Sequence, residues 1–221
     1  MATLAQLRTQ IRYRTNQEST TFVTDSELTD YINQSTRELY DLLVAAYEDY
    51  FTTATSFTIA GGASTKTLTD IVAAGVYKVL GLDWQYETGL FETLPQWHFG
   101  DRNRDTRRSY RVIGGAIHIL PTTLAPGTYK LWAIPYFTAL SADGDVFDGI
   151  SGWDEYVIVD ASIKVRDKAE EDPSVLIAQK GELLKRIQAM AQNRAAGEHQ
   201  SIRDVRYLAR TRYDRDDILL P

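Results

Sequence analysis

The sequence predicts an α+β protein: a four-helix bundle with an antiparallel β-sheet domain inserted between its second and third helices, followed by an extended C-terminal arm. Two observations lead to this prediction. The apolar residues recur every three to four positions up to about residue 50, every two positions over about 51–150, and at helical spacing again over about 151–197. Two helical patterns therefore precede the β pattern and two follow it, and one shared bundle buries all four economically.

The first helical zone, residues 1–50, contains two patterns. In the first, apolar residues at spacings of three and four share one helix face: Leu4, Leu7 and Ile11. The second begins with a capping-box sequence, in which the Thr24 oxygen accepts the backbone N–H of Glu27 and the Glu27 carboxylate reaches back. An apolar repeat then predicts a helix from Asp25 to about Glu48.

The β zone, residues 51–150, is rich in short turns. Gly114-Gly115 separates the alternating segments 110–113 and 116–120, which is a strong signal for a two-residue hairpin. Short connections of this kind favour an antiparallel sheet or a small barrel. Residues 86–108 are less regular, and Leu90 to Trp97 fits either one helical turn or a loop.

The last helical zone, residues 151–197, contains two predicted helices. The first starts at Ser151 or Gly152, and Glu171-Asp172-Pro173 separates it from the second, because proline disfavours helix in the residue before it. The second helix runs from about Ser174, with Gly197 as its expected stop. Residues 198–221 form the predicted C-terminal arm.

Composition excludes several classes of function. The chain has no cysteine, so disulfides, thiolate metal sites and cysteine nucleophiles are excluded. No apolar run reaches the ~18 residues of a membrane span, and the net charge of −6 disfavours a general nucleic-acid binder. The three histidines are widely separated, and no motif for a catalytic, metal or cofactor site stands out. We therefore expect neither an enzyme nor a cofactor.

An arginine cluster stands against this acidic background: Arg102, Arg104, Arg107, Arg108 and Arg111. Asp101 and Asp105 lie among them. Such a cluster fits a surface that meets phosphate or an acidic partner, and it fits equally well a solvated loop of the β zone. Both interpretations stay open at this point.

The predicted arm mixes charged residues with apolar anchors. Its arginines alternate with aspartates and aromatic or aliphatic residues, and the following positions are the candidate contacts: Arg203, Arg206, Tyr207, Arg210, Arg212, Ile218, Leu219 and Leu220. A purely disordered tail carries fewer such anchors. We expect an arm that orders on a neighbouring protein through its arginines and apolar residues.

Several short segments, taken in order, resemble the head–tail connector (adaptor) proteins of tailed bacteriophages. They lie in both helical zones and in the arm: Leu4-Ala5-Gln6-Leu7-Arg8-Thr9, Phe22-Val23-Thr24-Asp25-Ser26-Glu27-Leu28, Tyr31-Ile32-Asn33, Gly152-Trp153-Asp154-Glu155-Tyr156-Val157, Glu171-Asp172-Pro173-Ser174, Gly197 and Asp204-Val205-Arg206. In the β zone the agreement is in placement more than in motif.

The resemblance implies a structural protein of the virion, located at the head–tail junction and made in the host bacterial cytoplasm. It implies a twelve-fold ring of neighbouring copies below the portal protein. Such a ring extends the channel for double-stranded DNA, without sequence specificity, and offers a platform for a downstream tail protein. The arm would then contact the portal or an adjacent subunit. The arginine cluster would face the channel or the tail component. No membrane is involved.

Three alternatives remain. A tail-tube or receptor-side tail component would use the β zone as its binding module. A carbohydrate-active enzyme would need a concave site with carboxyl groups such as Glu87 and Glu92 beside Trp84 and Trp97. A DNA-binding regulator is disfavoured by the acidic charge.

Overall fold

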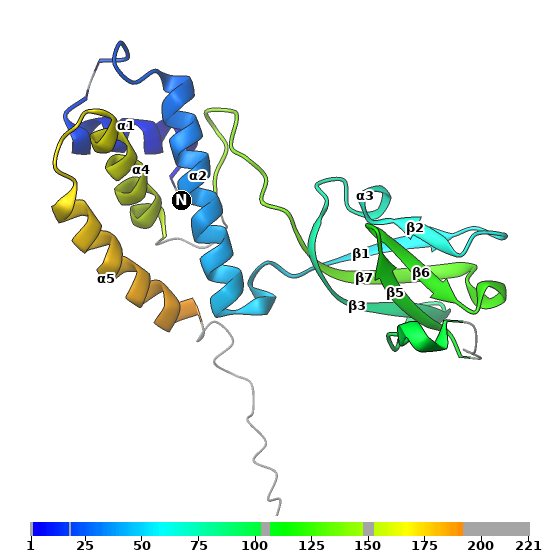
Figure 1. Ribbon diagram of the computed structural model, residues 1–221. Coiled ribbons are helices and arrows are strands. Elements are labelled where there is room, and N and C mark those ends of the chain that lie inside the picture. Colours follow the sequence, from blue (N-terminus) through cyan, green and yellow to red (C-terminus); the bar gives the residue numbers. More distant parts are fainter. Residues whose placement is uncertain (1, 18, 103–106, 148–152, 192–221) are drawn as a thin grey trace, which may run out of the picture.

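Helices and strands lie in two different parts of the molecule (Figure 1). The computed structural model describes residues 2–17, 19–102, 107–147 and 153–191. These residues form an α+β structure with antiparallel sheets, as the sequence predicts. The helices are α1 (Leu4–Thr15), α2 (Asp25–Ala46), the single turn α3 (Leu68–Ile71), α4 (Asp154–Lys168) and α5 (Ser174–Ala191). The strands are β1 (Thr53–Ile59), β2 (Thr65–Thr67), β3 (Val76–Glu87), β4 (Leu90–Thr93), β5 (Ser109–Ile113), β6 (Ala116–Leu120) and β7 (Gly127–Pro135).

Side-chain caps define where the first two helices begin. Thr3 and Gln6 form a complete capping box at α1, because the Thr3 hydroxyl accepts the Gln6 N–H and the Gln6 side chain accepts the Thr3 N–H. At α2, the predicted bond from the Glu27 N–H to Thr24 Oγ1 is present at 3.2 Å. The Glu27 carboxylate also binds Lys168 at the end of α4, so it ties two helices together.

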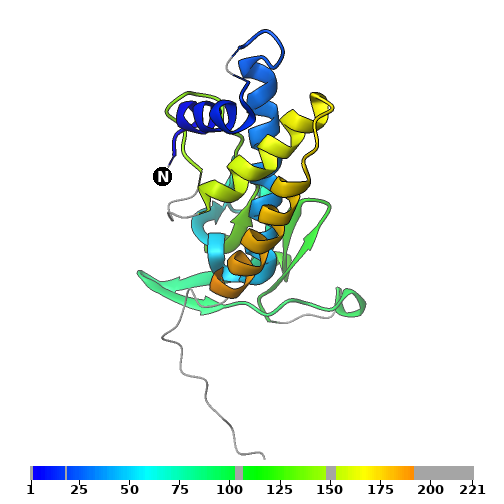
Figure 2. The same ribbon diagram turned by 90° about the vertical axis from the view of Figure 1, so that its left-hand side faces the viewer.

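Helix α4 lies at the centre of the helical part. It contacts α1, α2 and α5, and Figure 2 shows α4 and α5 running side by side. Most of its side chains are buried on all faces, from Tyr156 to Ser162, as expected for a helix that other helices surround. The stripe predicted for α1 points into the same core, where Leu4, Leu7 and Ile11 are fully buried.

The β part consists of two antiparallel sheets, with strand orders β1-β7-β3-β4 and β2-β6-β5. A second hydrophobic core, which includes Leu82, Tyr110, Ile117 and Tyr129, is built from residues of both sheets. The predicted hairpin is confirmed: Ile113 pairs with Ala116 around Gly114-Gly115, and both glycines have positive φ. The undecided segment after residue 89 is β4, which pairs with β3.

An aromatic cluster lies where the chain passes between the two parts. Tyr40 on α2 stacks on Phe51 with ring centroids 4.2 Å apart, and its hydroxyl donates to the Pro135 carbonyl at 2.6 Å. Burial, together with the nearby Asp41 carboxylate, raises the pKa of Tyr40 to about 12. We call Tyr40, Phe51, Tyr77, Tyr136 and Phe137 the junction cluster. It connects the helical part to the start of β3 and the end of β7.

Candidate functional site

The structure separates the predicted arginine cluster into two environments. Arg108 lies over the Trp84 ring at 3.5 Å and donates to the Leu124 carbonyl at 2.8 Å, so its side chain packs against the β part. Arg102 and Arg111 instead flank a different aromatic pair. Arg107 is exposed, and Arg104 lies outside the described residues. The solvated-loop interpretation therefore does not fit Arg108, whose charge serves packing.

Trp97 and Phe99 form the aromatic centre of the second environment. Their rings stack with centroids 6.3 Å apart, and Arg111 lies 5.5 Å from the Trp97 ring centre and 5.6 Å from that of Phe99. Arg102 lies 5.0 Å from the Phe99 ring and donates to the Phe99 carbonyl. Phe99 is 54% exposed. The exposed Phe99 ring with Arg102 and Arg111 beside it has the composition of energetically dominant protein contacts, and the buried Trp97 ring supports it from below.

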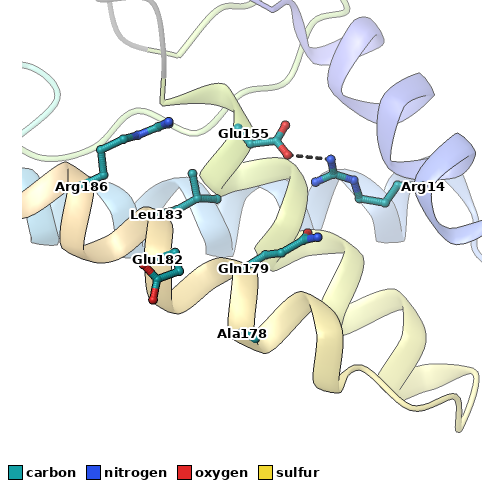
Figure 3. A pocket seen from close by; sticks show the side chains of 7 residues that line it. All are labelled: Arg14, Glu155, Ala178, Gln179, Glu182, Leu183 and Arg186. Carbon is teal, nitrogen blue, oxygen red and sulfur yellow. Dashed lines mark hydrogen bonds and ion pairs between the residues drawn. The ribbon is translucent and has the colours of Figure 1, made fainter.

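A groove on the helical part is a second candidate contact surface (Figure 3). It has a volume of about 660 Å³ and lies where the end of α1, the start of α4 and the outer side of α5 meet. The Arg14 guanidinium binds the Glu155 carboxylate at 2.6 Å on one wall, while Glu182, Leu183 and Arg186 line the opposite wall. The groove offers both signs of charge around an aliphatic floor.

A buried ion network joins three helices next to this groove. Asp160 on α4 accepts hydrogen bonds from Lys164 and, at 2.7 Å, from Lys180 on α5. Lys164 also donates to Ser35 on α2 at 2.7 Å. Burial pushes the pKa of Asp160 up, but the hydrogen bonds from Lys164 and Lys180 outweigh this effect and hold it below its ordinary value. The pKa of Lys180 is raised, since the hydrogen bonds that its ammonium donates to Asp160 and Glu38 outweigh the cost of burial. The network is a structural link.

The acidic residues of the segment before α4, Asp143 and Asp145, also make structural contacts. The Asp143 carboxylate binds Arg8 at 2.7 Å, and Asp145 accepts the backbone N–H groups of Ser141 and Ala142. These two backbone bonds lower the pKa of Asp145. In the described ranges, histidine, aspartate and glutamate side chains do not gather into a group of three that would hold a metal ion. Within the same ranges, each helix is too short or too polar to cross a bilayer.

Three of the residues named for a carbohydrate-active site lie on one hairpin, where Trp84 is paired with Glu92, but Trp97 lies in a different environment. Glu87 and Glu92 are exposed on the hairpin of β3 and β4. Trp84 packs under Arg108, whereas Trp97 belongs to the cluster with Arg111. Glycoside hydrolysis requires two carboxyl groups that flank a bound sugar in a concave site. This geometry gives the enzyme alternative no support.

The sequence prediction named the arginines and missed their aromatic partners. It also missed the junction cluster. A usable signal was present for both, because aromatic residues gather at each border of the β zone, at Tyr50-Phe51 and at Tyr136-Phe137, and around Trp97. The candidate contacts of the arm, from Arg203 to Leu220, lie outside the described residues.

One comparison with known proteins supports the expectation that this chain assembles with other proteins. No curated protein matches the chain. The family model described as SU10 adaptor protein matches residues 2–212, which is nearly the whole sequence. This is a phage head–tail adaptor family, as the resemblance in the helical zones indicates. The chain therefore belongs to the SU10 adaptor protein family.

Proposed function

We propose that this chain is a structural head–tail adaptor that forms a ring below the portal, extends the DNA channel and provides a platform for tail attachment. Its domains would be a four-helix bundle from residues 1–50 and 151–197, the inserted β domain from residues 51–150, and the arm from residues 198–221. The family supports a structural role in a phage particle. It catalyses no reaction in this proposal.

The observation that carries the proposal is the presence of two separate hydrophobic cores in one chain. One core joins α1, α2, α4 and α5, and the other lies in the β part. An adaptor must bind one partner without releasing another. Two parts with independent cores offer separate rigid surfaces for that purpose, joined through the junction cluster.

The surfaces fit a ring built from head-to-tail contacts. A closed ring of identical copies needs two different patches on each copy, because each patch meets the other patch of the next copy. The helical groove and the surface around Phe99 are chemically different and lie on different parts of the chain. We assign the arm residues Arg203, Arg206, Tyr207, Arg210 and Arg212 to contacts with the portal or an adjacent copy.

The negative net charge of the chain fits a channel that lets DNA pass without binding it strongly. Sequence-independent binding of duplex DNA depends on a net positive surface that displaces counterions. At −6, the chain has no net positive charge to supply such a surface. Double-stranded DNA would pass the ring without strong attachment, and the arginine cluster would serve the tail component instead of the channel.

Light scattering on the purified protein, alone and mixed with its cognate portal, tests the proposal. A mass several times 25.0 kDa, or a monomer that joins the portal in equal copy number, would support it. Removal of residues 199–221 should then weaken portal or ring assembly while the circular dichroism spectrum keeps its helical signal. A monomer that ignores the portal would contradict the proposal.

A further inference from the structure

A cavity of about 580 Å³ lies on the β part, beside the Trp97–Phe99 pair. Its lining residues come from α3, β3, β5 and the segment before η2 (Phe99–Asp101). They include Leu68, Val76, Lys78, Val79, Gln96, Trp97, His98, Arg111 and Val112.

The cavity wall combines cationic and aliphatic side chains. Arg111 uses one N–H group to bind the Trp97 carbonyl at 3.3 Å, and an arginine has five such donors. Lys78 pairs with Glu48 of η1 (Glu48–Phe51). Among the described residues that line the cavity, none is an aspartate or a glutamate. Because Glu48 already neutralises Lys78, the wall offers the Arg111 guanidinium to a negative group and its aliphatic side chains to an apolar group of an occupant.

Trp97 adds a second, independent indication of an acceptor. Its side chain is only 8% exposed, and its Nε1–H is buried without an acceptor among the described residues. A buried donor without an acceptor costs free energy, so such groups normally find a partner. Because the Arg111 guanidinium lies 5.5 Å from the centre of the same ring, a carboxylate beside Trp97 would meet Arg111, and it would reach Nε1 once the side chains that cover this atom move.

The sequence itself contains a segment with these properties. Residues 214–217 supply three aspartates, and Ile218, Leu219 and Leu220 follow directly. The chain from residue 192 to residue 213 connects this segment to the end of α5, and about twenty extended residues reach about 70 Å. The segment can therefore reach well beyond its own subunit.

We infer that Asp214–Pro221 of a neighbouring copy binds the β-part cavity. Its carboxylates accept hydrogen bonds from Arg111, and its leucines contact the aliphatic wall near Leu68 and Val79. The inference rests on the proposed ring for the choice of a neighbouring copy. The cavity is then the binding site for the tip of the arm, and the arginines of the arm remain available for the portal.

Engineered disulfides test this contact in the full-length protein, which has no cysteine of its own. His98 lines the cavity and is exposed, so H98C combined with L219C should link neighbouring copies under mild oxidation. The matched control is S56C combined with L219C, because Ser56 is exposed on β1 and does not line the cavity. We expect linked copies to form at least about tenfold faster in the first pair, owing to the high effective concentration of a bound segment.

Substitutions on each side of the contact sharpen the test. R111Q should slow the H98C–L219C cross-link about tenfold, since a charge-assisted hydrogen bond is lost. R102Q is its control, because Arg102 lies on Phe99 and does not line the cavity. The arm variant D214N/D216N/D217N should slow the cross-link to a similar extent without touching the described fold.

Three results would overturn the inference: equal rates for the two cysteine pairs, no loss of rate in the arm variant, or a disulfide that forms only within one chain. Light scattering on the same samples keeps this test separate from that of the proposed function. A ring without the cross-link contradicts only the cavity contact, whereas a monomer that ignores the portal contradicts the adaptor function itself.

Discussion

In the helical part, Asp160 is buried and holds two lysines between three helices, whereas in the β part the cations lie on aromatic rings near the surface. The charges of Asp160, Lys164 and Lys180 are paired with one another inside the subunit. Arg102 and Arg111, by contrast, each donate to one backbone carbonyl among the described residues and lie 5.0 to 5.6 Å from the Phe99 and Trp97 rings. The difference indicates that the buried charges of this network stabilise the helical part, whereas Arg102 and Arg111 are the cations of the β part that we assign to recognition.

The substitution D160N tests most directly whether the buried charges stabilise the helical part. Removal of the carboxylate charge leaves Lys164 and Lys180 facing each other in a half-buried site, so we expect a loss of about 3 kcal/mol in the free energy of unfolding. Urea denaturation followed by circular dichroism at the helical signal measures it. E38Q is the control, because Glu38 is 45% exposed in its pair with Lys180 and should cost less than about 1 kcal/mol.

The junction between the two parts is tested by G75A. Gly75 has φ +80°, and an added Cβ would lie 2.7 Å from the Tyr136 ring, so both backbone strain and displacement of Tyr136 are expected. We predict a loss of about 2 kcal/mol. G89A has nearly the same φ, +81°, with open space around its Cβ, and reports the strain alone. Equal losses in the two variants would show that the Tyr136 contact contributes nothing.

The pH dependence of stability tests whether the ionised carboxylate of Asp160 stabilises the fold. Its pKa in the folded protein lies below the ordinary value of 3.8, so its ionisation favours folding above pH 3.8, and that contribution is lost as the pH falls through the lower folded value. The stability difference between the native chain and D160N should therefore shrink in acid. Urea midpoints measured for both proteins from pH 6 to pH 3 test this. A difference that stays constant would assign the loss to packing.

The smallest expected effect on stability distinguishes two arginines of the β part, Arg108 and Arg102. R108A removes a guanidinium stacked at 3.5 Å on Trp84 and a bond to Leu124, and should cost about 1 kcal/mol. R102A affects an exposed contact at 5.0 Å from Phe99 and should change stability by less than about 0.5 kcal/mol. The tryptophan fluorescence of the protein, to which Trp84 contributes together with three other tryptophans, follows the change during denaturation. Similar losses for both would remove the distinction between packing and recognition.

Local patterns were sufficient for much of the secondary structure. The apolar spacing predicts a helix through Leu4, Leu7 and Ile11, where α1 lies, and α2 close to its observed bounds. The start predicted for α5, Ser174, is also observed, whereas its expected stop, Gly197, lies outside the described residues. The paired glycines predict the hairpin of β5 and β6, because a two-residue turn depends on allowed φ values. The capping box at Thr3 follows a similar local rule but is not among the sequence predictions, and β4 has only four residues, which carry little periodic signal.

For the candidate surfaces, the sequence by itself determined the composition: an arginine cluster in an acidic chain, an arm of mixed charge, and an order of segments typical of phage adaptors. The tertiary structure decided which arginine packs and which remains available. Trp84 lies on β3, so its contact with Arg108 depends on how the two sheets close over one core, whereas Trp97 meets Arg111 because the segment around Gln96 pairs with β5. Contacts between residues that are distant in the sequence produce no periodic pattern from which they could be predicted, because only folding brings these residues together.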